Sequence, residues 1–180
     1  MTKYILSLCL IALIGIGNIS AHADDLENNA DLFTQLEGSW VIHTWFSESD
    51  GGRREKDAWM TITRMESEQA PVFMFEETHN TIAGDLFISR LIYAYHAQSN
   101  VWRGTGINTL ANRKWRDVSV VDNQIQFLES GELFGGQEGK KRFVYFNVTG
   151  DRFESRTEES LDGMSWKDAG YGYTAERVKN

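Results

Sequence analysis

The feature that most constrains the fold is a series of ten strand-length segments that follow one another between residues 39 and 177. Each is rich in Val, Ile, Thr or aromatic residues and is bounded by turn-forming residues, which is typical of β-strands. Beyond the N-terminal region, no long segment has the apolar period of an amphipathic helix. The predicted strands are 39–46, 58–65, 72–79, 86–95, 101–110, 114–121, 124–129, 142–148, 152–161 and 166–177.

The connections between these segments predict how the strands are arranged. Those at 121–124, 149–152 and 161–164 contain Asn, Asp or Gly, which tolerate the positive φ of tight hairpins. The connections at 47–57 and 130–141 are longer. Strands joined mostly by short turns form an antiparallel meander, and a meander of about ten strands removes its edges by closing. We therefore predict an all-β, antiparallel up-and-down barrel in one domain, residues 24–180.

The N-terminal residues have the pattern of a signal peptide rather than of a folded element. Lys3 precedes an apolar run from residue 4 to residue 16, and Ala21-His22-Ala23 matches a small-x-small cleavage site. The run is shorter than the roughly 20 residues of a spanning helix. We predict cleavage after residue 23, a periplasmic or secreted protein, and no integral membrane span in the mature chain.

Charge and cysteine content exclude several kinds of partner and stabilisation. The chain has 18 basic and 26 acidic residues, a formal net charge of −8 at pH 7, which argues against nucleic acid and anionic lipid. Its single cysteine, Cys9, lies in the predicted signal peptide, so the mature chain has no disulfide and depends on a hydrophobic core. Nothing in the sequence specifies an oligomeric state.

Two short motifs, one at the start of the first predicted strand and one at the end of the chain, resemble a known family. The segment Gly38-Ser39-Trp40 resembles the G-x-W signature of the calycin superfamily, which includes lipocalins and fatty-acid-binding proteins. Residues 160–178 resemble the S-x-D-G-x-x-W hairpin and terminal strand of bacterial secreted lipocalin-like domains of unknown function. The resemblance implies a cup-shaped barrel around a small hydrophobic ligand, with no fixed catalytic residues. It implies structural roles for Gly38, Trp40, Asp162, Gly163, Trp166 and Arg177.

Aromatic and cationic side chains on the middle strands are the candidates for ligand contact. The chain has six Trp, six Tyr and ten Phe, which either line a pocket or fill a core. Arg90 shares a strand face with Leu86, Ile88 and Ile92, and a guanidinium inside a barrel needs an anion or several acceptors. The anion would be either a ligand carboxylate or the carboxylate of an internal partner, Glu76 or Glu129. The predicted ligand-binding residues are Arg90, Tyr93, Tyr95, Trp102, Arg103 and Trp115.

Glu77 and His79 are the candidates for catalysis. They are two residues apart on a predicted strand, so their side chains project to the same face and could exchange protons. His43 on the first strand could join them. The chain has no H-x-x-x-H spacing and no cysteine ligand after residue 23, so we predict neither a metal site nor a cofactor.

Three functions are consistent with these patterns. The first is an exported barrel that binds a small apolar or amphipathic molecule. The second is a cofactor-free isomerase, cyclase or lyase that uses the barrel interior. The third is a structural or partner-binding barrel filled by its own aromatic side chains. Interior volume separates the third from the others, and a converging set of Glu, His and Tyr side chains would favour the second.

Overall fold

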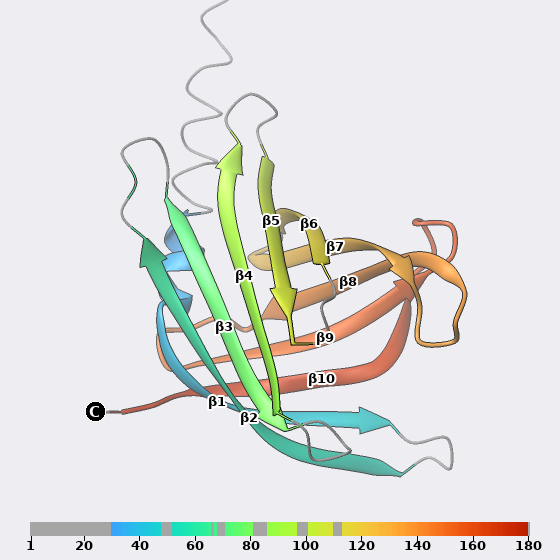
Figure 1. Cartoon of the computed structure of the whole chain (residues 1–180), viewed down its shortest axis with the longest axis horizontal. Helices are drawn as coiled ribbons and strands as arrows, with labels where there is room; N and C mark the ends of the chain where they lie inside the picture. The colour runs from blue at the N-terminus through green and yellow to red at the C-terminus, as the bar shows by residue number, and fades with distance from the viewer. Residues whose placement is uncertain are drawn as a thin grey trace, which may run out of the picture.

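The computed structural model describes residues 30–47, 52–65, 67, 71–80, 86–96, 101–109 and 113–179. Ten β-strands lie in these residues (Figure 1). They are β1 (Gly38–Ser47), β2 (Arg53–Met65), β3 (Val72–Asn80), β4 (Leu86–His96), β5 (Val101–Asn108), β6 (Arg113–Val121), β7 (Gln124–Glu132), β8 (Glu138–Phe146), β9 (Arg152–Ser160) and β10 (Lys167–Arg177). The predicted signal peptide, 1–23, lies outside the described residues.

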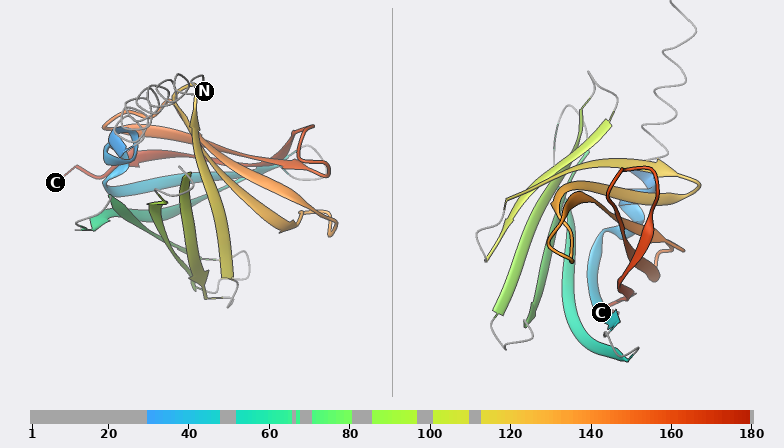
Figure 2. Two further views of the ribbon diagram at one scale, coloured as in Figure 1. Left: turned by 90° about the horizontal axis from the view of Figure 1, so that it is seen from above. Right: turned by 90° about the vertical axis from the view of Figure 1, so that its right-hand side faces the viewer.

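The strands form a closed antiparallel barrel in simple up-and-down order. Each strand pairs with the next along the chain, and β1 pairs with β10 from Trp40–Arg177 to Phe46–Tyr171. Figure 2 shows the strands curving around a common interior. Closure gives every strand two neighbours, as in lipocalin-like barrels. The predicted fold class is therefore confirmed.

The turn residues act as their chemistry predicts. Asp122 and Asn123 form the two-residue turn between β6 and β7, with φ of 51° and 60°. Gly163, with φ of 74°, lies between β9 and β10. These backbone conformations suit Asn, Asp and Gly because left-handed φ is costly for most other residues.

The connection predicted at 130–141 is much shorter in the structure. β7 continues to Glu132, and β8 begins at Glu138. The two strands are paired from Glu132–Glu138 onward, and this pairing includes Glu129–Lys141. Ladder hydrogen bonds use only backbone groups, so a charged side chain does not by itself end a strand. β2 likewise begins at Arg53, inside the predicted connection 47–57. Charged residues in the segments 47–57 and 130–141 therefore do not mark the ends of the strands.

A short helix at residues 30–36 plugs the barrel interior. Its central residue, Phe33, is fully buried and stacks on Trp102 with ring centroids 4.8 Å apart and on Phe73 at 5.4 Å. Phe127 meets it edge-on at 6.2 Å. The helix fills this part of the interior through Phe33, and Trp40, for which the family resemblance implies a structural role, has a different one.

Trp40 instead joins the helix to the seam between β1 and β10. It is fully buried, and its Nε1 donates to the carbonyl of Leu36 at 2.8 Å. The guanidinium of Arg177 lies over its ring at 4.3 Å and donates to the carbonyl of Gln35 at 2.8 Å. Arg177 also donates to the carbonyls of Glu37 and Gly150. Gly38, with φ of 136°, lies so close to Arg177 that a Cβ would overlap its guanidinium.

The β9–β10 hairpin is held by Asp162. Its Oδ1 accepts hydrogen bonds from the backbone N–H groups of Met164 and Ser165, each at 2.8 Å, and from Ser160 Oγ at 2.9 Å. These donors hold the pKa of Asp162 well below its usual range. Trp166 packs under the guanidinium of Arg142, 4.3 Å from the ring centroid. The six residues for which the resemblance implies structural roles thus each have a contact or a backbone conformation that accounts for them.

Candidate ligand pocket

The barrel contains an interior pocket of about 270 Å³. Its walls come from inward-facing positions of strands β2 to β8, because alternate side chains of each strand point to the interior. The lining residues are Met60, Phe75, Glu77, Phe87, Ser89, Leu91, Tyr93, Asn108, Arg116, Glu129, Phe134, Lys141, Phe143 and Tyr145. The pocket excludes the interpretation that the barrel is completely filled by its own side chains.

The polarity of the pocket changes along the strands. Glu77, Ser89 and Asn108 are cross-strand partners on β3, β4 and β5 and form one polar row. The next inward row toward the helix contains Phe75 and Leu91, which are partners on the same strands. An apolar wall beside a polar row suits a molecule with one apolar part and one hydrogen-bonding part.

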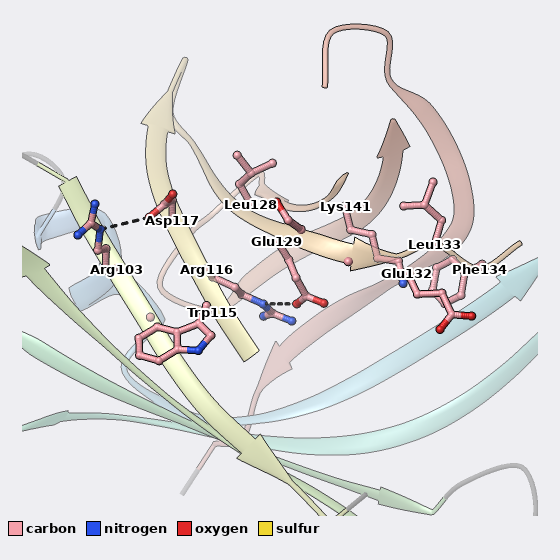
Figure 3. A pocket seen from close by; sticks show the side chains of 13 residues that line it. Arg103, Trp115, Arg116, Asp117, Leu128, Glu129, Glu132, Leu133, Phe134 and Lys141 are labelled. Atoms are coloured by element: carbon pink, nitrogen blue, oxygen red, sulfur yellow. Dashed lines mark hydrogen bonds and ion pairs between the residues drawn. The ribbon is translucent and has the colours of Figure 1, made fainter. Parts of the chain in front are cut away.

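An ion pair between Arg116 and Glu129 forms part of the lining. Arg116 Nε is 3.1 Å from Glu129 Oε2, and the two side chains are only 15% and 8% exposed. Arg116 Nη1 donates to the Tyr93 hydroxyl at 3.1 Å, and its guanidinium lies 4.3 Å from the centroid of the Phe143 ring. Burial alone would lower the pKa of Arg116, but Tyr93 and Glu129 together raise it above its ordinary value. The pair brings one positive and one negative charge to the pocket wall, and Figure 3 shows the contact between the two side chains.

Gly104 explains how Tyr93 reaches Arg116 across the sheet. Tyr93 pairs with Gly104 on β5, and Gly104 pairs with Arg116 on β6, so the three lie in one row. A Cβ at Gly104 would overlap the Tyr93 ring, so only glycine leaves room for it. Gly104 therefore permits the close packing of the Tyr93 ring against β5.

Buried tyrosine hydroxyls form a second polar group in the interior. Tyr173 donates to the Tyr145 hydroxyl at 2.5 Å, and burial raises the pKa of both phenols. Burial also raises the pKa of Tyr93 and Tyr171. All four phenols are therefore neutral at physiological pH and can donate hydrogen bonds.

The structure places three predicted residues inside the barrel, but in two different environments. Tyr93 lines the pocket. Trp102 is buried in the aromatic cluster around Phe33, and Tyr95 packs edge-on against it at 5.9 Å. Trp102 and Tyr95 therefore fill the core beside the helix and are not among the residues that line the pocket.

Three predicted ligand contacts point outward, so their expected position in the interior is wrong. Arg90 is 64% exposed and pairs with Glu76 on the outer face of β3 and β4. Arg103 pairs with Asp117 at 3.3 Å, and Trp115 is 70% exposed. Leu86 and Ile92 share this face with Arg90 and suggest an interior face, but both are exposed. The Arg–Glu alternative named the correct partner, Glu76, but the pair lies outside.

The candidate catalytic residues are only partly brought together. Glu77 faces the interior and lines the pocket with Tyr93 and Tyr145. His79 lies two residues further along β3, where it pairs with Phe87, and its side chain lies outside the described residues. His43 cannot join them, because it is exposed and its Nδ1 lies 2.8 Å from Asp57 Oδ1. Within the described ranges, no group of three or more His, Cys, Asp or Glu could hold a metal.

Arg116 is the site residue that sequence reasoning missed. A signal was present in strand β6, because Arg116 shares its face with Val118 and Val120, whereas Trp115 shares its face with Asp117 and Ser119. The alternation therefore placed Arg116 inside and Trp115 outside. The prediction that Trp115 faces the interior is opposite to this alternation.

A closed ten-strand antiparallel barrel with a partly polar interior pocket defines a lipocalin-like barrel protein. In the described residues, no helix is long and apolar enough to cross a membrane. No protein-family model matches the chain, and its sequence matches no curated protein.

Solved structures nevertheless share this barrel. One is the S-type phycobiliprotein lyase CPES from Guillardia theta, with a TM-score of 0.59 and 8% identity over 84% of this chain and 93% of that one. Another is Rv2717c from M. tuberculosis, with a TM-score of 0.53 and 11% identity over 86% of this chain and all (100%) of that one. At these identities the likeness shows the fold alone.

Proposed function

We propose that this protein is an exported carrier or receptor of the calycin type that binds one small amphipathic molecule inside the barrel. The observation that carries the proposal is the interior pocket, whose apolar wall lies beside a polar row. Arg116 and Glu129 orient the ligand through hydrogen bonds, and the aromatic wall buries its apolar part.

The charge of the pocket favours a neutral ligand. Arg116 already has Glu129 as its counter-ion, so a ligand carboxylate would have to compete with a buried carboxylate for the guanidinium. Arg90, which was expected to hold an acidic ligand group, lies outside the barrel. A neutral molecule with a hydrogen-bonding edge fits the paired charges better than a fatty acid does.

Fluorescence titration with two related dyes tests this proposal. Neutral N-phenylnaphthylamine should bind with enhanced emission, and its anionic relative anilinonaphthalene sulfonate should bind at least about tenfold more weakly, a difference of about 1.4 kcal/mol. Ser89→Phe or the smaller change Ser89→Leu should weaken binding of the neutral dye, because Ser89 is buried in the pocket wall.

The matched control is Ser119→Phe, which adds the same ring to an exposed position of β6. Its affinity for the neutral dye should equal that of the wild type. If neither dye binds, or if Ser89→Phe and Ser119→Phe bind equally well, the interior is not a ligand site.

A lyase or isomerase is the second candidate, and Glu77 is the observation that favours it. Its carboxylate lines the pocket beside the neutral phenols of Tyr93 and Tyr145, which could stabilise a developing oxyanion while Glu77 accepts a proton. One barrel of similar fold is named a lyase. Glu77→Gln should keep dye affinity and abolish any deuterium exchange into a panel of small ketones, as measured by mass spectrometry. Exchange at the wild-type rate in Glu77→Gln would exclude Glu77 as the base.

Export is proposed on the N-terminal sequence alone. The mature protein should begin at Asp24 and contain no thiol, because Cys9 would be removed with the leader. Intact mass and N-terminal sequencing of the protein recovered from the periplasm or medium check this. A recovered chain that begins at Met1, or that reacts with a thiol reagent, would contradict it.

A further inference from the structure

Strands β6 and β7 separate part of the way along their length. Their ladder runs from Val121–Gln124 to Asp117–Leu128 and ends there. Beyond that point β6 continues to pair with β5 as far as Arg113, and β7 continues to pair with β8 as far as Glu132. The barrel wall therefore has a split between residues 113–116 and 129–132.

Gly131 contributes to this separation. Its φ of 148° lies outside the range that side chains with a Cβ favour, so β7 leaves regular extended geometry just beyond Glu129. β7 remains paired with β8 through Gly131 and Gly139, so it follows β8 and leaves β6.

A cavity of about 860 Å³ occupies the split. Figure 3 shows Arg116 and Glu129 meeting across it, with Trp115 on one side and Phe134 on the other. Trp115 and Phe134 are 70% and 62% exposed and form an aromatic rim. Phe134 is held in place, because its N–H donates to Glu159 at 2.7 Å and Lys141 lies over its ring at 4.5 Å.

The split lies next to the interior pocket. Arg116, Glu129, Phe134 and Lys141 line both spaces, so the buried ion pair forms the boundary between them. A molecule that enters from the side would meet the aromatic rim first and the polar pair second.

We propose that the split between β6 and β7 is the entrance and outer half of the ligand site, and that it admits a neutral, planar aromatic molecule. This inference rests on the proposed function and adds a route and a ligand class to it. Two charge pairs line the split, Arg116 with Glu129 and Arg103 with Asp117. The exposed rings of Trp115 and Phe134 provide stacking surfaces for a planar ligand.

The remaining hydrogen-bonding capacity of Arg116 lies at this boundary. Its Nε is taken by Glu129 and its Nη1 by Tyr93, and the described residues provide no hydrogen bond to its Nη2. A ligand carbonyl or ring nitrogen could accept a hydrogen bond from Nη2 without displacing Glu129 or Tyr93 from the guanidinium. This chemistry selects a neutral acceptor over an anion.

A disulfide across the split tests the route. In a Cys9→Ser background the chain has no other thiol. Trp115→Cys with Ser130→Cys places two thiols where the ladder would continue beyond Asp117–Leu128. Oxidation should slow association of N-phenylnaphthylamine at least about tenfold in stopped-flow measurements, and reduction should restore it. Comparing both redox states of one variant removes the effect of losing Trp115.

The matched control is Ser119→Cys with Gln126→Cys, which joins the same strands at a pair that is already in register. Its oxidation should leave the association rate unchanged. Where the first disulfide does not form, a bulky maleimide on Ser130→Cys should slow association, and the same label on Ser119→Cys should not.

The outcomes separate this inference from the proposed function. Unchanged association after blocking the split, with dye still bound in the interior, overturns the route and leaves the binding function standing. Absence of dye binding in the wild type overturns both. Equal slowing by the control disulfide would show a general effect of cross-linking and also overturn the route.

Discussion

Trp40→Ala is expected to lower the free energy of unfolding by about 3–5 kcal/mol, the range of aromatic truncations in protein cores. Trp40 is fully buried, donates to Leu36 and supports the guanidinium of Arg177. Its loss would leave a cavity at the place where the helix, β1 and β10 meet. Urea denaturation followed by circular dichroism measures the change.

Trp45→Ala is the matched control on the same strand. The Trp45 side chain points to the opposite face of β1 and is only partly buried. Its truncation should therefore lower the free energy of unfolding clearly less. Small and equal losses in the two variants would contradict the role of Trp40 as the residue that joins the helix to the barrel seam.

Breaking the buried ion pair should have an effect of similar size. Arg116→Met removes the guanidinium that pairs with the buried Glu129, and removal of one partner of a buried pair costs about 3–5 kcal/mol. Glu129→Leu should be comparably destabilising, since it removes the carboxylate that pairs with the buried guanidinium of Arg116. The double variant replaces both charges by apolar groups and should recover most of the loss.

A double-mutant cycle measures this coupling. Strongly non-additive unfolding free energies, with the double variant more stable than either single variant, are the expected result. Additive losses would mean that the two charges act independently.

The barrel could be predicted because its signals are local. Turn residues at 121–124 and 161–164 fix hairpins, and hairpins in series leave closure as the simplest way to remove edges. Strand ends at charged segments were less predictable, since backbone pairing continues through Lys141 and Glu132 regardless of side-chain charge.

The site was harder to predict because alternation gives two faces and does not say which is inside. On β4 both faces are apolar, with Leu91 and Tyr93 on one and Ile88 and Ile92 on the other. The neighbouring strand, β5, shows which face of β4 is inside. Gly104 and Gly106 pair with Tyr93 and Leu91, and a large residue opposite a glycine marks the crowded interior. Without the pairing register, this signal could not be used.

The split in the wall could not be predicted from local signals. It depends on β7 following β8 rather than β6 after residue 128, which is a competition between two partners far apart in sequence. Gly131 alone would be consistent with any bulge or turn.

Native mass spectrometry of the protein purified from its own source tests the central claim most directly. The wild type should carry one small neutral molecule per chain, and that molecule should be absent from Ser89→Phe purified in the same way, because the added ring occupies the pocket. Bare wild-type protein that also fails to bind N-phenylnaphthylamine, or a ligand retained equally by Ser89→Phe, would contradict an interior ligand site.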